Sequence, residues 1–123
     1  MISVAGKYKV LSAATLSGYL VRSRSNEDLG CVEELMLDSG TGKIAYAVLS
    51  FGGVLGFGGK LFAVPWNALK LDPDQRVLIL DADRRRLENA PAFHEEDWPD
   101  FADEQWGDQI HSYYGLRPYW ECA

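Results

Sequence analysis

The sequence has few of the residues that build metal sites and catalytic centres. Of its 123 residues, two are cysteines, Cys31 and Cys122, and two are histidines, His94 and His111. No Cys-x-x-Cys pair and no cysteine–histidine cluster occurs, which argues against a zinc site. Catalytic triads need a histidine, and both histidines lie in an aromatic segment where packing or a surface position explains them. We therefore expect no enzyme activity, no metal site and no cofactor.

The chain also lacks a long apolar run. A charge-free stretch at residues 44–59 has 16 residues and is broken by five glycines, whereas a membrane-spanning helix needs about 20 apolar residues. The N-terminal residues include lysines and lack the continuous apolar core of a secretory signal. We expect no transmembrane segment and a cytoplasmic location, with peripheral association with a membrane left open.

Basic residues are scarce at the end of the chain. Residues 1–90 carry 11 Lys/Arg and 10 Asp/Glu, whereas residues 91–123 carry Arg117 and eight acidic residues, so the formal charge of −6 comes from the tail. An acidic segment repels a phosphate backbone, which disfavours nucleic acid as a partner. The basic run Arg84–Arg86 keeps RNA open as an alternative.

The same tail is rich in aromatic residues. It holds eight of the 15 Phe, Trp and Tyr residues, and disordered acidic segments are poor in such residues. Apolar positions recur at helical spacing through residues 100–115, and Gly115 is suited to cap the helix at its C-terminus. We expect an ordered tail with a short helix.

Residues 51–66, FGGVLGFGGKLFAVPW, place five glycines before Lys60. A phosphate-binding P-loop needs glycine at the position of Val54 and serine or threonine at the position of Leu61. The dinucleotide-binding pattern also fails, because it requires glycine at position 61. We interpret the stretch as a long hairpin loop whose exposed apolar residues contact protein.

Short strands fill the first ninety residues. Turn-rich segments separate candidate strands at 18–23, 31–38, 43–51, 60–66 and 76–80, and residues 67–72 form a further strand or a helical turn. Strands at this spacing, without long helices between them, predict an antiparallel sheet or a small barrel. The strand at 43–51 is apolar on both faces, which predicts that the tail or a second subunit covers its outer side.

The segments LGCVEELMLD (29–38) and GKIAYAVLSFGGVLGFGGKLFAVPW (42–66) resemble the PRC-barrel family. This family includes the cytoplasmic domain of the photosynthetic reaction centre H subunit and the C-terminal domain of the ribosome maturation factor RimM. The resemblance covers residues 13–83, and residues 88–93 and 113–120 resemble the tail of stand-alone bacterial members. It implies a mainly β fold: a small antiparallel β-barrel with a short helical, aromatic-rich C-terminal tail. It also implies an adaptor or assembly role without enzyme chemistry.

These observations divide the chain into an N-terminal extension (1–12), the barrel (13–83) and the acidic aromatic tail (84–123). The leading hypothesis is a protein-interaction module that forms a homodimer and binds an unidentified protein partner. Its expected surface comprises apolar and aromatic residues of the loop and the tail: Phe51, Val54, Leu55, Phe57, Leu61, Tyr114, Tyr119 and Trp120. The alternatives are an assembly factor that contacts RNA-containing particles through Lys60 and Arg84–Arg86, and an accessory protein of a membrane photosynthetic or electron-transfer complex.

Overall fold

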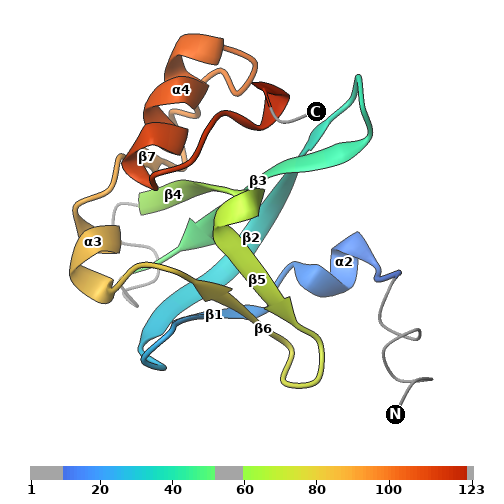
Figure 1. The fold of residues 1–123 in the computed structure, drawn as a ribbon, viewed down its shortest axis with the longest axis vertical. Coiled ribbons are helices and arrows are strands. Elements are labelled where there is room, and N and C mark those ends of the chain that lie inside the picture. Colours follow the sequence, from blue (N-terminus) through green and yellow to red (C-terminus); the bar gives the residue numbers. More distant parts are fainter. Residues whose placement is uncertain (1–9, 52–59, 122–123) are drawn as a thin grey trace.

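The computed structural model describes residues 10–51 and 60–121, which form a curved sheet with helices at its margins (Figure 1). The elements are α2 (Ala13–Leu16), β1 (Leu20–Ser23), β2 (Asp28–Asp38), β3 (Lys43–Ser50), β4 (Lys60–Pro65), the 3-10 helix η1 (Trp66–Ala68), β5 (Leu69–Asp72), β6 (Val77–Leu80), α3 (Arg84–Glu88), β7 (Phe93–His94), α4 (Glu104–Tyr113) and the 3-10 helix η2 (Tyr119–Glu121). The predicted strands are confirmed to within three residues at either end. Residues 67–72 divide between η1 and β5.

Seven strands form one sheet, in the order β5-β6-β1-β2-β3-β4-β7. The prediction of a purely antiparallel sheet was wrong, because β1 and β6 pair in parallel from Leu20–Val77 to Ser23–Leu80. Hairpin turns dictate antiparallel pairing only between the strands that they join, and β1 and β6 are far apart in the sequence. The predicted closed barrel is also corrected, since no ladder joins β5 to β7 among the described residues.

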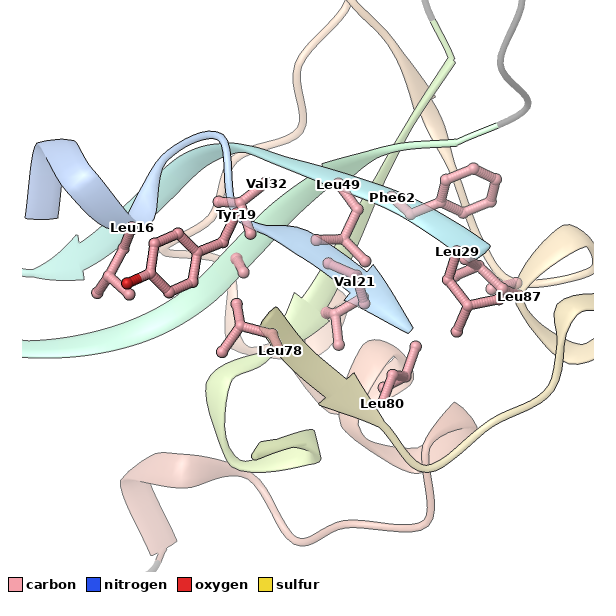
Figure 2. Close-up of a cluster of buried hydrophobic side chains, with 13 residues drawn as sticks. Leu16, Tyr19, Val21, Leu29, Val32, Leu49, Phe62, Leu78, Leu80 and Leu87 are labelled. Atoms are coloured by element: carbon pink, nitrogen blue, oxygen red, sulfur yellow. The ribbon is translucent and has the colours of Figure 1, made fainter. Parts of the chain in front are cut away.

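The sheet curves around one apolar core (Figure 2). Buried side chains from the strands and from both flanking helices converge there: Leu16, Tyr19, Val21, Leu29, Val32, Ala47, Leu49, Phe62, Val64, Leu78, Leu80, Leu87 and Ala90. Burying each large aliphatic side chain contributes about 1.5–3 kcal/mol to stability. Because this core contains no charged side chain, binding chemistry has to be sought on the outer surface.

The tail crosses the outer side of the sheet, where α4 lies over β4 (Figure 1). The side chain of Asp103 accepts a hydrogen bond from the Gln105 N–H and caps the start of α4. At its end, Gly115 adopts a φ of 71° and the Leu116 N–H bonds to the His111 carbonyl. These contacts satisfy the last carbonyls of the helix, and they confirm Gly115 as its C-terminal cap.

A candidate interaction surface

Tyr46 of β3 is the centre of an aromatic cluster between the sheet and the tail. Its ring meets four tail rings at centroid distances of 5.3–5.9 Å: Phe101, Trp106, His111 and Tyr119. Tyr46 is 1% exposed and packs with Ile110 of α4, and this burial raises the pKa of its hydroxyl. The chain's own tail therefore covers Tyr46 on the outer face of β3. The sequence had predicted that either the tail or a second subunit covers this face.

His111 is fully buried in this cluster and holds two parts of the tail together. Its Nε2 accepts a hydrogen bond from the Tyr119 N–H at 3.2 Å. Its Nδ1 therefore carries the proton and donates to the Gly107 carbonyl, 2.7 Å away. Both ring nitrogens are occupied by backbone groups, so His111 organises the tail rather than facing a ligand.

Tyr119 links the end of the tail to the far end of β2. Its hydroxyl donates to Oδ2 of Asp38 at 2.7 Å. This bond, together with N–H groups from Gly40 and Thr41, holds the pKa of the Asp38 carboxyl below its ordinary value. Burial, the Asp38 carboxylate and the charge of Glu104 raise the pKa of Tyr119 to about 12. The tail is thus fastened at both Tyr46 and Asp38.

This fastening predicts a pH-dependent effect of Tyr119→Phe. The pKa of Asp38 is lowered in the folded protein, so its carboxylate contributes stability above the unfolded value of about 3.9 and loses it as pH falls through the folded pKa. The melting temperature of Tyr119→Phe should lie below that of the wild type at pH ~6 and approach it near pH ~3.

Tyr113→Phe is the matched control for this prediction, because the Tyr113 hydroxyl donates to the Arg86 carbonyl and not to a carboxylate. Its difference from the wild type should not change with pH over the same range. The prediction would be contradicted if the melting temperature of Tyr119→Phe lay below that of the wild type by the same amount at every pH. So would an Asp38 pKa, followed by carboxyl NMR, that is the same in Tyr119→Phe as in the wild type.

The described members of the eight-residue set expected to form one surface lie in different places. Leu61 is 6% exposed and pairs with Phe93 of β7. Phe51 is partly buried, packs edge-on against Phe62 and lies under the guanidinium of Arg84. Both therefore belong to the packing of the fold.

Of the other members of that set, Val54, Leu55 and Phe57 lie outside the described residues. Tyr114 is partly buried, and Trp120 is 36% exposed at the end of the tail beside Tyr119. Because Phe51 follows the end of β3 whereas Tyr119 contacts Asp38 beside its start, the described members of the set lie at both ends of β3 and do not form one patch.

The alternative RNA contacts Arg84–Arg86 are partly engaged within the protein. Arg84 donates through its backbone N–H to Glu27 and through its guanidinium to the Asp28 carbonyl. Arg86 donates to the Tyr113 carbonyl and lies 4.7 Å from the centre of the Tyr113 ring. Two of the three arginines thus connect α3 to β2 and to the end of α4.

A shallow groove of about 250 Å³ lies beside the end of α4. Arg24, Lys70, Tyr114 and Leu116 are among its lining residues. Arg24 pairs with Asp81 at 3.3 Å, but both side chains are more than two-thirds exposed, and such exposed pairs contribute little. The groove is smaller than the clefts that usually enclose a ligand.

A surface that the sequence reasoning missed is the arm, which we define as residues 33–45. Within the arm, β2 has no pairing among the described residues on the side of β1, because the hydrogen bonds on that side end at Val32, which bonds to residues 18 and 19. The first residues of β3 likewise have no pairing with β4, since that pairing begins at Tyr46. Figure 1 shows this ribbon projecting from the sheet, with the end of the chain beside it. One signal was available: Leu35 and Leu37 share one face of a strand longer than its neighbour.

The arm has a covered face and an apolar face. Met36 packs with the aromatic cluster and Asp38 bonds to Tyr119, so the tail covers their face. On the other face, Leu35 packs against the main core, while Leu37 is 62% exposed next to its cross-strand partner Ile44. Leu37 is therefore the exposed large apolar side chain of this face, and Leu35 and Ile44 beside it are partly buried.

No helix of the described residues has the length and apolarity required to cross a membrane. Within residues 10–51 and 60–121, no three His, Cys, Asp or Glu side chains gather so that they could hold a metal ion. The family model for the PRC-barrel domain matches residues 9–87, a span that contains α2 and β1–β6. No curated protein matches the chain.

Proposed function

Because this chain belongs to the PRC-barrel family, we propose that it is a non-enzymatic protein-interaction module that forms a homodimer and binds a further protein. The observation that carries the proposal is the apolar face of the arm, where Leu37 is 62% exposed at the end of a projecting hairpin. A small domain buries a limited fraction of its surface, so a second copy that packs on this face would add stability.

The environment of the titratable side chains supports a role without catalysis. His111 uses both ring nitrogens for backbone hydrogen bonds, and Asp38 is bonded to Tyr119 and to the following turn. A general acid or base must instead present a free atom to a substrate. The polar groups described here stabilise the tail, and the apolar face of the arm is a surface that a partner can reach.

Two alternatives have weaker support. An RNA contact through Arg84–Arg86 would have to compete with the internal bonds of Arg84 and Arg86. An accessory role at a membrane complex would use the apolar residues 54–57 as its contact, and these lie outside the described residues. The arm favours a protein partner over both.

Leu37→Lys tests the proposed homodimer. The full chain should elute at about twice its 13.7 kDa mass when size-exclusion chromatography is coupled to light scattering at micromolar concentration. Leu37→Lys should elute as a folded monomer whose melting temperature, unlike that of the dimer, does not depend on protein concentration, because a charge on an exposed face opposes association without disturbing the core.

Leu20→Lys is the control for this experiment, since Leu20 is 46% exposed on β1, outside the arm. It should leave the mass of the wild type unchanged. A monomeric wild-type chain would overturn the homodimer. A monomeric Leu20→Lys would instead place the dimer contact outside the arm.

A further inference from the structure

The edge of β2 along the arm has no neighbouring strand among the described residues. The Val32 carbonyl accepts from the Gly18 N–H, and the Val32 N–H donates to the Tyr19 carbonyl. Beyond this point the chain bends into α2, while β2 continues to Asp38 with β3 on its other side. Backbone groups along an edge of this kind can pair with an added strand.

We infer that this edge, residues 33–38, accepts an extended cationic segment of another protein as an added strand; the inference rests on the proposed interaction role and specifies its partner. The edge is distinct from the apolar face proposed for the homodimer, because a strand adds in the plane of the sheet whereas a second copy packs onto its face. The two contacts can therefore form together.

The negative charge of the arm determines that the partner segment is positively charged. Residues 33–38 contain Glu33, Glu34 and Asp38 and no basic residue, and Lys43 is the one basic residue of the arm. Glu104 of α4 adds to this negative field, since its charge acts on Tyr119, the residue bonded to Asp38. An anionic strip of this kind attracts a segment rich in Lys or Arg and repels an acidic one.

The same charges disfavour a second copy of β2 on this edge. In the antiparallel register that pairs all of residues 33–38, Glu33 of each copy would lie opposite Asp38 of the other. Like charges directly opposite one another destabilise a strand pair, and edge charges are a common protection against self-association. The edge is therefore suited to a basic partner and guarded against its own copy.

The side chains of the arm specify the pattern of the added strand. Leu35 and Leu37 lie on one face of β2, and Glu34, Met36 and Asp38 lie on the other. An added strand would place apolar side chains beside the leucines and basic side chains beside the carboxylates, because cross-strand neighbours share a face. The chemistry that fits is an alternation of Lys or Arg with β-branched apolar residues.

Amide hydrogen exchange of the full chain tests this inference. The probe is a six-residue peptide that alternates lysine with valine and is blocked at both ends; the control peptide has glutamate in place of lysine. The lysine peptide should slow exchange at residues 33–38 by about tenfold or more, because outward N–H groups gain a partner. The effect should weaken between about 0.05 and 0.5 M salt, and the glutamate peptide should have none.

Charge reversal at the edge sharpens the test. Glu34→Lys should weaken the response to the lysine peptide, because it reduces the formal charge of residues 33–38 from −3 to −1. Glu88→Lys, on the exposed side of α3, makes the same charge change elsewhere and should leave both responses as in the wild type.

Four results would overturn the inference: equal responses to the two peptides, protection confined to residues outside the arm, protection of the outward N–H groups of residues 33–38 in the free protein that rises with its concentration, and protection of those groups in the free protein that does not depend on its concentration. The third would place a second copy on the edge, and the fourth would place the chain's own residues there. Light scattering reads the homodimer independently. If the protein is a monomer and its arm responds to the lysine peptide, only the proposed homodimer is contradicted. If the protein is a dimer and its arm does not respond, only the added-strand inference is contradicted.

Discussion

Gly30→Ala should destabilise the protein by at least about 4 kcal/mol, a loss comparable with the whole stability of many small domains. A Cβ at this position would lie 2.0 Å from the Ser50 carbonyl oxygen and 3.2 Å from the Phe51 Cα. Both atoms belong to the backbone, so no rotation of a side chain relieves the overlap. β2 would have to move away from β3 at the point where Cys31 pairs with Ser50.

Gly18→Ala is the control that isolates this overlap. Gly18 and Gly30 share a φ of 98°, but a Cβ at Gly18 meets nothing within 4 Å. The left-handed backbone alone costs about 1–2 kcal/mol for a residue with a side chain, so Gly18→Ala should lose this amount. Urea unfolding followed by tryptophan fluorescence gives both free energies. Equal losses for the two variants would show that the strands do not approach this closely at Gly30.

Gly30 also illustrates where sequence reasoning stopped. Residues 25–30 have the composition of a turn, so the predicted strand began at Cys31. The structure starts β2 at Asp28, whose side chain accepts from the Gly30 N–H at 3.0 Å, and Gly30 lies inside the strand. The glycine is needed because another strand passes within contact distance, and the sequence contains no local sign of that neighbour.

The parts of the fold that could be predicted depend on neighbours along the chain. The hairpin between β2 and β3 follows from residues 39–42, where Gly42 has a φ of 78° and Asp38 accepts N–H bonds from the turn. The same turn shows the limit, since Gly40 and Gly42 are both glycines and Gly42, but not Gly40, is among the residues with a positive φ. The parallel pairing of β1 with β6 joins distant segments, and no turn between them reports it.

The candidate surface was predicted less well than the fold for a related reason. Hydropathy identified the apolar outer face of β3 and the aromatic tail as features that needed partners, and the structure packs Tyr46 against that tail. Because the outer face of β3 and the aromatic tail cover each other, an apolar surface that stays exposed is the face of the arm that contains Leu37. Its exposure depends on β1 being shorter than β2, which is a property of strand pairing and not of residue type.

Gly107→Ala should destabilise the protein by about 1–3 kcal/mol, the usual cost of overpacking a filled interior. In an exposed helix the same change would stabilise by about 1 kcal/mol, because alanine has the higher helix propensity. Gly107 is buried in α4, and a Cβ there would lie 2.6 Å from the Tyr46 hydroxyl and 2.8 Å from Cη2 of Trp120. The sign of the effect therefore reports whether the tail is seated on the sheet.

Tyr46→Phe should partly rescue Gly107→Ala, because it removes the closest atom of the overlap. The Tyr46 hydroxyl is buried without a hydrogen-bond partner among the described residues. Its loss alone should thus be neutral or stabilise by about 1 kcal/mol. The two changes should couple by about 1 kcal/mol or more in a double-mutant cycle measured by urea unfolding, with the overlap at Trp120 accounting for the loss that persists.

Gln109→Gly and Gln109→Ala, at an exposed position of the same helix, give the glycine-to-alanine propensity difference without the overlap, and it should favour alanine by about 1 kcal/mol. If Gly107→Ala instead stabilised the protein, and if its effect added to that of Tyr46→Phe without coupling, α4 would not lie against Tyr46. The outer face of β3 would then be open to a second subunit, the other cover that its two apolar faces allow. The double-mutant cycle therefore distinguishes a tail that packs on the outer face of β3 from a tail that leaves this face exposed to a second subunit.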